Sequence, residues 1–282
     1  TRISPKDFVI AFADGSIGVY DVQKKKYETK VPKAHVSTVF CCSFLPTDPD
    51  IFATGGGGGR ICFWRLPTLE QQPELSMSES NQSLLSLSFS EGGTYLATGS
   101  GNGYVTIYNT KTNKIHFKSR LYHRGVISVE WCPNNPNLLA TSSKGRVCYI
   151  FDTTKRLISI KISIKNEFRR LKWSKKDLSI AIACGDGNLY VRLDGGTYFI
   201  IRGSKYPLYD VAWSPFDPNQ VAATDDGGNV LLFDIKSKTA KCALGHNGKA
   251  RPITWSTAKK DLLISGGYDG VICFWDSKTM SL

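Results

Sequence analysis

The stretch from residue 207 to residue 244, PLYDVAWSPFDPNQVAATDDGGNVLLFDIKSKTAKCAL, decides the fold class. It contains four short apolar segments, at residues 208–213, 221–224, 230–235 and 240–244. Ser214-Pro215 separates the first two segments, and the glycines of Asp225-Asp226-Gly227-Gly228 allow the positive φ of a tight turn. No part of the stretch shows the periodicity of a helix. The pattern therefore predicts a unit of four short antiparallel β-strands.

The same unit recurs along the whole chain. The third segment ends on an aromatic residue in most units, at Tyr20, Trp64, Tyr108, Phe151, Phe233 and Trp275, and we expect Leu193 at this position in the remaining unit. The first segment ends on a second aromatic series, at Phe44, Phe89, Trp131, Trp173, Trp213 and Trp255. Both series repeat about every 40 to 45 residues. A single unit cannot bury both of its faces, so we expect neighbouring units to stack on one another.

Length and composition narrow the class of protein. The chain has 282 residues, of which 41% are hydrophobic, so it can bury a sizeable core and is not disordered. No apolar run approaches the roughly 20 residues of a membrane-spanning helix, and we expect no membrane insertion. The eight cysteines form no CxxC pair and no zinc-spaced cluster with histidine. We therefore expect no metal, no cofactor and an intracellular location, either cytoplasmic or cytoskeleton-associated, with the nucleus also open.

Dipeptides at the edges of the units carry a family resemblance. Gly245-His246 precedes the first strand of the last unit, and Trp275-Asp276 ends its third strand. Partial matches are Ala34-His35 with Trp64-Arg65, and Tyr122-His123 with Phe151-Asp152. These pairs resemble the signature of the WD-repeat β-propeller family. The resemblance implies an all-β, seven-bladed WD-repeat β-propeller that forms a single domain over residues 1–282.

The ends of the chain suggest that the propeller is incomplete. Asp14–Asp21 and His35–Phe44 carry a narrower likeness to the second propeller of a larger WD-repeat protein. Only Thr1–Ser4 remains to supply the first strand of the first blade, and the chain stops at Leu282, close to where the last fourth strand would begin. We therefore expect an incomplete closing seam between the first and last blades. We also expect a fragment of a longer polypeptide, with two propellers as one possible organisation.

Four residues of the last unit allow two interpretations. Ser265, His246 and Asp269 are the residue types of a hydrolase triad. In a WD repeat, the same residues together with Trp275 resemble a structural tetrad of hydrogen-bonded side chains, which supplies partners for buried polar atoms. We favour the structural tetrad because the residues occur in a repeat and no G-x-S-x-G turn surrounds Ser265. The chain is accordingly predicted not to be an enzyme, with no catalytic residues.

The charge balance is compatible with two classes of function. Lysine and arginine number 36 against 24 acidic residues, a formal net charge of +12. Such a surplus favours acidic partners. We predict a non-catalytic protein–protein interaction scaffold within a larger assembly, whose partners are other proteins with an acidic surface. The alternative is an electrostatic binder of an acidic polymer, either nucleic acid or an acidic tubulin surface.

The loops of a blade indicate where a partner would bind. In a propeller, the loops before first strands and the turns between second and third strands share a face, and interface anchors are enriched in aromatic residues and arginine. The candidate protein-interaction residues on this face are Val36, Ser37, Arg124, Phe168, Arg169, Tyr206, Tyr209, Arg251 and Tyr268. In the segment 168–173, strict alternation predicts that Arg169 and Leu171 share one side of the strand, with Arg170 and Lys172 on the other.

Overall fold

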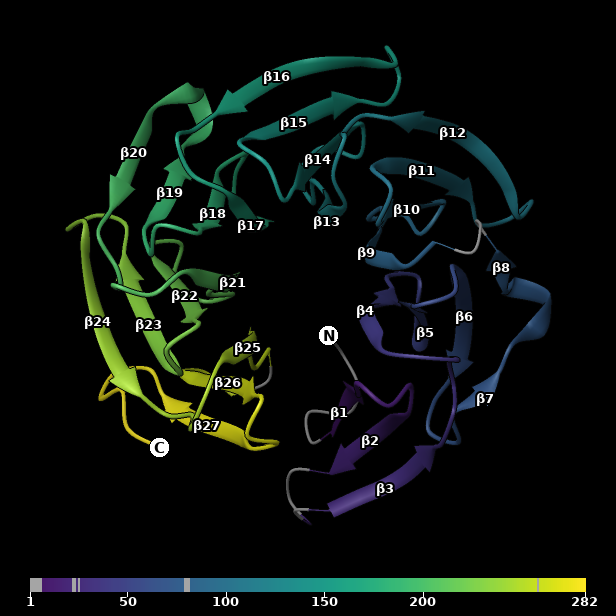
Figure 1. Ribbon diagram of the computed structural model, residues 1–282, viewed down its shortest axis with the longest axis horizontal. Helices are drawn as coiled ribbons and strands as arrows, with labels where there is room; N and C mark the ends of the chain where they lie inside the picture. The colour runs from purple at the N-terminus through teal and green to yellow at the C-terminus, as the bar shows by residue number, and fades with distance from the viewer. Residues whose placement is uncertain (1–6, 22–23, 25, 79–81, 258) are drawn as a thin grey trace. The chain divides into compact units, whose positions relative to one another are not determined.

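The computed structural model describes residues 7–21, 24, 26–78, 82–257 and 259–282 (Figure 1). Apart from two short 3₁₀ turns, the regular elements of this part of the chain are β-strands. In the described residues, seven antiparallel sheets follow one another in chain order. The prediction of an all-β, seven-bladed WD-repeat propeller is confirmed. The chain divides into two compact units, residues 1–131 and 132–282.

The first unit contains three sheets and one further strand. The first sheet is formed by β1 (Asp7–Ala11), β2 (Ile17–Asp21) and β3 (Lys26–Val31). The second is formed by β4 (Val39–Leu45), β5 (Asp48–Gly56), β6 (Arg60–Arg65) and β7 (Glu70–Gln71). A further short strand, β8 (Met77–Ser78), follows the 3₁₀ turn Pro73–Leu75 and also pairs with β6. The third is formed by β9 (Leu84–Phe89), β10 (Tyr95–Ser100), β11 (Tyr104–Asn109) and β12 (Lys114–Arg120). Strand β13 (Val126–Trp131) packs against β9 and β10.

The second unit holds the remaining strands. It begins with β14 (Leu138–Ser143), β15 (Val147–Asp152) and β16 (Leu157–Ser163). The fifth sheet is formed by β17 (Phe168–Trp173), β18 (Ile180–Cys184), β19 (Leu189–Arg192) and β20 (Tyr198–Ile201), with the 3₁₀ turn Asp194–Gly196 before β20. The sixth is formed by β21 (Leu208–Trp213), β22 (Gln220–Asp225), β23 (Asn229–Asp234) and β24 (Thr239–Leu244). The last is formed by β25 (Ala250–Trp255), β26 (Leu262–Gly267) and β27 (Ile272–Asp276).

One cross-strand pair recurs in the sheets and corrects the position expected for the fifth aromatic residue. An apolar residue of the second strand faces the aromatic residue of the third, as in Val221 opposite Phe233 and Leu263 opposite Trp275. In the fifth sheet, Ile180 faces Arg192. The predicted position, Leu193, is therefore wrong by one residue. Leu193 instead occupies the place that Asp234 has in the sixth sheet.

Successive sheets of the second unit are joined by an apolar core and by tryptophans. Leu189 and Val191 of the fifth sheet share one buried cluster with Val211 and Leu231 of the sixth. Burying an aliphatic side chain of this size contributes about 1.5–3 kcal/mol. The indole N–H of Trp213 donates to the carbonyl of Lys172 at 2.9 Å, and that of Trp255 donates to the carbonyl of Ala212 at 3.0 Å. Trp213 and Trp255 thus each connect their sheet to the preceding one.

A glycine in the turn between second and third strands allows the next loop to approach closely. Gly228 has a φ of 86°, and a Cβ atom there would lie 2.3 Å from the carbonyl oxygen of His246. Gly187 repeats this arrangement one sheet earlier, against the carbonyl oxygen of Ser204. Any larger residue would meet both a strained backbone and a clash. These glycines therefore fix the loop before a first strand against the turn of the preceding sheet.

The first and last sheets each contain three strands in the described residues. Thr1–Ser4, expected to supply a further strand of the first sheet, lies outside the described residues. After β27, Asp276 and Ser281 form an isolated bridge. The incomplete closing seam and the single domain over residues 1–282 stay predictions.

Candidate protein-interaction site

The first strands β17, β21 and β25 share a β-bulge near their beginning. A bulge inserts one extra residue into a strand and re-aims the side chains beside it. Arg169 lies at the bulge of β17, Tyr209 at that of β21 and Arg251 at that of β25. Three of the predicted interaction residues are therefore presented by the same backbone feature.

The bulge makes the alternation predicted for β17 wrong. The register shifts between Phe168 and Leu171, and both of these side chains are fully buried in the same core cluster. Arg169 and Arg170 are half-buried between them. Leu171 therefore shares the buried side with Phe168 and not with Arg169. Because Phe168 is 0% exposed, it offers no surface to a partner, and we no longer count it among the interaction residues.

Arg251 is held between two tyrosine rings. Its guanidinium carbon lies 4.0 Å from the ring centroid of Tyr209 and 4.6 Å from that of Tyr268. Its Nη1 donates to Oδ1 of Asp226 at 2.6 Å, and only 13% of the Arg251 side chain is exposed. A guanidinium over an aromatic face is attracted by the quadrupole of the ring, and this attraction grows as water is excluded. The charge, the stacking and the burial together fix one orientation of Arg251.

The turn that carries Asp226 also positions Tyr206. The amide of Asp226 donates to the carbonyl of Pro207 at 2.9 Å. A Cβ atom on Gly227 would lie 2.2 Å from the ring of Tyr206, so the glycine allows the ring to rest on the turn. Tyr206 remains 39% exposed, and Tyr268 is 73% exposed. We define the aromatic–arginine cluster as Tyr206, Tyr209, Asp226, Arg251 and Tyr268.

The structure brings four predicted residues into this cluster and adds one that the sequence did not single out. Tyr206, Tyr209, Arg251 and Tyr268 were predicted from residue type and loop position. Asp226 was assigned to a turn, and its pairing with an arginine 25 residues later has no signal in the sequence. Lys249 adds a second cation, with Nζ 3.6 Å from Oδ2 of Asp226.

Four other predicted residues lie outside the cluster. Val36 and Ser37 are exposed residues of the first unit that face a glycine-rich turn. A Cβ atom on Gly57 would overlap Oγ of Ser37, and one on Gly58 would lie 2.9 Å from the Val36 side chain. Arg124 is exposed in the loop before β13. Arg169 is half-buried, with an Nε atom that has no hydrogen-bond partner in the described residues.

The predicted tetrad of the last sheet forms one continuous network. Nε2 of His246 lies 2.8 Å from Oγ of Ser265, and the indole N–H of Trp275 donates to the same oxygen at 2.9 Å. Nδ1 of His246 lies 3.2 Å from Oδ1 of Asp269. Burial raises the pKa of Asp269, but hydrogen bonds from the amides of Val271 and Asn247 and from His246 outweigh it and hold the pKa below its ordinary value.

The accessibility of the tetrad decides between its two interpretations. A hydrolase must admit a substrate to the serine oxygen. Ser265 is 1% exposed and His246 is 3% exposed, and the hydroxyl oxygen already accepts the indole proton of Trp275. This geometry favours a structural network over a catalytic triad.

Comparison with known families follows the repeats. The model of the WD40 family, described as "WD domain, G-beta repeat", matches residues 26–65, 71–109 and 245–276. These ranges include the tetrad of the last sheet and its partial counterpart around His35, Thr54 and Trp64. With the seven sheets, they define a WD40-repeat β-propeller. The chain therefore carries WD repeats over these ranges.

Three relatives show how far this likeness extends. Protein transport protein SEC31 of Mycosarcoma maydis is 24% identical over 277 residues, covering 84% of this chain and 20% of that protein. The tRNA (guanine-N(7)-)-methyltransferase non-catalytic subunit wdr4 of Dictyostelium discoideum is 29% identical over 206 residues, covering 63% and 43%. Histone acetyltransferase type B subunit 2 of Candida albicans is 25% identical over 203 residues, covering 72% and 43%. The chain thus spans less than half the length of each relative.

No helix in the described residues is long and apolar enough to cross a bilayer.

Proposed function

We propose that this chain is a non-catalytic protein-interaction module of a larger assembly, and that the aromatic–arginine cluster is one of its contact surfaces. The observation that carries the proposal is the guanidinium of Arg251, which lies over the rings of both Tyr209 and Tyr268. Interfaces draw most of their binding energy from a few tyrosine, tryptophan and arginine residues. A side chain that is already ordered loses little conformational entropy when a partner binds.

The residues of the cluster become more exposed from Arg251 outwards, which suits an interaction surface. Arg251 lies deep, while Tyr268 and Tyr206 present exposed ring surface around it. Asp226 balances the arginine, so a partner would meet aromatic surface and polar ring hydroxyls more than a free positive charge. The cluster is therefore suited to a shaped protein surface with a polar rim.

The names of the relatives agree with an interaction module. One is named as a non-catalytic subunit, one as a subunit of an acetyltransferase and one as a transport protein. The stretches Asp14–Asp21 and His35–Phe44 resemble the second propeller of WD-repeat-containing protein 17. We also propose that the chain is part of a longer polypeptide whose partners have acidic surfaces. We expect this polypeptide to be intracellular, and either cytoplasmic, cytoskeleton-associated or nuclear.

The net charge of +12 supports a second candidate function. An electrostatic binder of nucleic acid or of an acidic tubulin surface would release counterions on binding, and its affinity would fall steeply with salt. A desolvated contact centred on aromatic residues would depend much less on salt. Salt dependence therefore separates the two candidates.

Affinity capture at low and high salt tests the proposal, with the full-length parent protein as bait. The matched control to Tyr268→Ala is Tyr198→Ala, because Tyr198 is also an exposed tyrosine of the second unit, 42% exposed, and lies on the outer strand β20. We expect the wild type and Tyr198→Ala to retain the same protein in both salts and Tyr268→Ala to lose it. Retention by Tyr268→Ala, or a captured set that consists of nucleic acid and elutes with salt, contradicts the proposal.

A further inference from the structure

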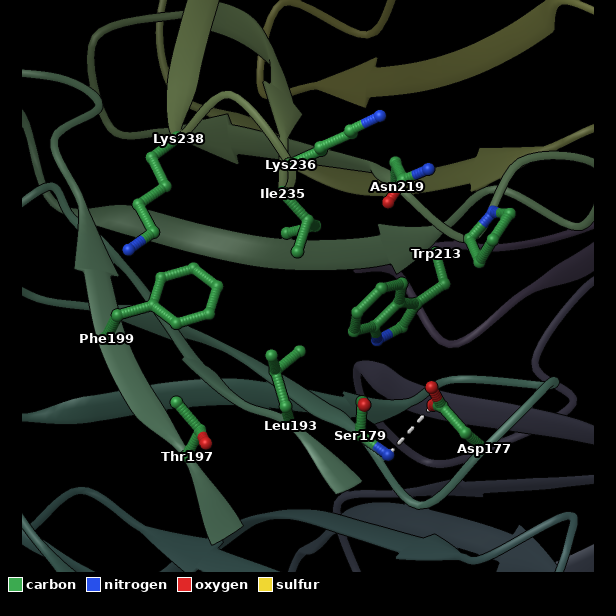
Figure 2. A pocket seen from close by; sticks show the side chains of 11 residues that line it. Asp177, Ser179, Leu193, Thr197, Phe199, Trp213, Asn219, Ile235, Lys236 and Lys238 are labelled. Atoms are coloured by element: carbon green, nitrogen blue, oxygen red, sulfur yellow. Dashed lines mark hydrogen bonds between the residues drawn. The ribbon is translucent and has the colours of Figure 1, made fainter. Parts of the chain in front are cut away.

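A hollow of about 400 Å³ lies between the fifth and sixth sheets (Figure 2). Its apolar lining includes Leu193 and Phe199 from the fifth sheet, and Trp213, Pro218 and Ile235 from the sixth. Trp213 ends β21, whereas Tyr209 of the aromatic–arginine cluster lies near the beginning of that strand. The hollow is therefore a separate feature at the opposite ends of these strands.

A local change in the fifth sheet accounts for the hollow. After the third strand of a sheet, the side-chain oxygen of an Asn or Asp usually accepts backbone amides two or three residues further on, as it does at Asn109, Asp152, Asp234 and Asp276. The equivalent residue in the fifth sheet is Leu193. The turn then continues through Gly195 and Gly196, with φ of 82° and 92°. An apolar side chain thus replaces a capping oxygen, and two residues without side chains leave it uncovered.

The walls of the hollow are fixed in place. The indole N–H of Trp213 is already bonded to the carbonyl of Lys172, so its ring presents a face rather than a donor. Lys238 has a φ of 57° in its turn, and its Nζ lies 4.8 Å above the ring of Phe199. Figure 2 shows Lys238 beside Phe199, with Ile235 and Leu193 directed into the space between the two rings. Such a preformed apolar space is typical of a ligand site.

Two lysines lie at the edge of the apolar walls. Lys236 and Lys238 line the hollow and are exposed, and the exposed Lys175 and Lys176 precede Asp177 at its opposite side. The carboxylate of Asp177 accepts the amide of Ser179 at 3.0 Å, so it is already engaged within its own turn. This rim is complementary in charge to an acidic occupant.

We propose that this hollow binds one large apolar side chain of an acidic peptide segment in a protein partner. The side chain enters between Leu193, Phe199, Trp213 and Ile235, and the flanking carboxylates meet Lys236 and Lys238. The site goes beyond the proposed function, since it uses neither Tyr268 nor Arg251. A partner that contacts both the hollow and the aromatic–arginine cluster gains affinity because the two contacts are linked. Each of the two sites is nevertheless supported by separate residues.

Fluorescence anisotropy with a labelled synthetic peptide tests this site. The probe has one central phenylalanine flanked on each side by two acidic residues. One comparison peptide carries alanine in place of phenylalanine, and the other carries amides in place of the carboxylates. We expect each change to weaken binding to the wild type roughly tenfold or more, because apolar anchor and charge act together.

The protein variants separate the hollow from general charge. Thr197→Trp fills the hollow from an exposed position, and Lys236→Glu with Lys238→Glu reverses the rim charge. The matched control is Lys111→Glu, because Lys111 is exposed and follows Asn109 as Lys236 follows Asp234. We expect roughly tenfold weaker binding for the first two and less than about a twofold change for the control.

The outcomes are decisive in both directions. Unchanged affinity in a folded Thr197→Trp variant, equal binding of the alanine peptide, or no binding of the probe to the wild type each overturns the proposal. A melting curve of Thr197→Trp that matches the wild type establishes that the variant is folded. Tyr268→Ala should bind the probe like the wild type, so that a failure here remains distinct from a failure of the proposed function.

Discussion

The hydroxyl of Ser265 shows at the scale of one residue how the last sheet depends on a buried network. Its oxygen lies within hydrogen-bond distance of both His246 and Trp275. Ser265→Ala leaves His246 and Trp275 buried without this hydroxyl as a hydrogen-bond partner. We therefore expect a loss of about 1–3 kcal/mol in the free energy of unfolding. Urea denaturation measures this loss, and the exposed Ser237→Ala serves as a control with little change. If the wild type hydrolysed an ester and a folded Ser265→Ala variant did not, the structural interpretation would be wrong.

His35 makes the corresponding contact to Thr54 in the second sheet, and burial, with a smaller contribution from Arg60, lowers the pKa of His35 to about 4. The unfolded chain has the ordinary pKa of 6.5, so it binds more protons than the folded chain between these values. This contribution to stability is therefore complete above pH 6.5 and is lost as the pH falls towards 4. We expect the urea midpoint of the wild type to fall in this window and that of His35→Gln to fall less. An identical pH dependence in both proteins would contradict the assignment, and the exposed His123→Gln is the control.

At the scale of the strand, the tryptophans that end first strands differ in a way that can be measured. The indole of Trp255 donates to the preceding sheet, whereas Nε1 of the equally buried Trp131 has no hydrogen-bond partner in the described residues. Trp255→Phe removes ring volume and a hydrogen bond, while Trp131→Phe removes ring volume alone. We expect Trp255→Phe to cost about 1 kcal/mol more in the free energy of unfolding. Equal costs in parallel urea titrations would show that the hydrogen bond between sheets contributes nothing.

At the scale of the strand, the sequence is also no longer sufficient to predict how residues pair and which side chains are buried. Alternating apolar residues and Gly-Asp turns predicted the sheets, and the pairing of Leu263 with Trp275 follows from that pattern. The bulge that buries Leu171 beside Phe168 was not predicted, because an extra residue changes the pairing without any distinct composition. Leu193 was misplaced for a related reason: it occupies the position of the capping Asn or Asp that marks the register in several other sheets. Asp226 was seen as a turn residue, and only the fold shows that it holds Arg251.

At the scale of the whole molecule, the terminal sheets should be the least protected. In the described residues, β1 pairs only with β2, and β27 pairs only with β26 apart from its bridge to Ser281. Edge strands with unpaired backbone groups open more readily than central ones. We expect faster hydrogen exchange in residues 8–21 and 262–282 than in the central strands β18 and β22. Uniform protection of all the sheets would show that these edges are covered, and the predicted incomplete seam would then be wrong.

The net charge of the whole chain and the shape of one surface make opposite predictions about binding. If total charge governs affinity, replacing any exposed lysine should weaken binding by a similar factor and reduce its dependence on salt. If the aromatic–arginine cluster governs affinity, its exposed rings should matter far more than lysines elsewhere. Lys114, which is exposed on β12, serves as the reference lysine.

The most direct test is the dissociation constant of the captured protein for the wild type, Tyr268→Ala, Tyr206→Ala and Lys114→Ala, each measured at low and high salt. We expect the two tyrosine variants to bind roughly thirtyfold more weakly, a loss of about 2 kcal/mol. Lys114→Ala should change the affinity less than about twofold and alter mainly its salt dependence. If all three variants bind alike, and affinity falls only with the number of lysines removed, the shaped-surface account is wrong and binding of an acidic polymer takes its place.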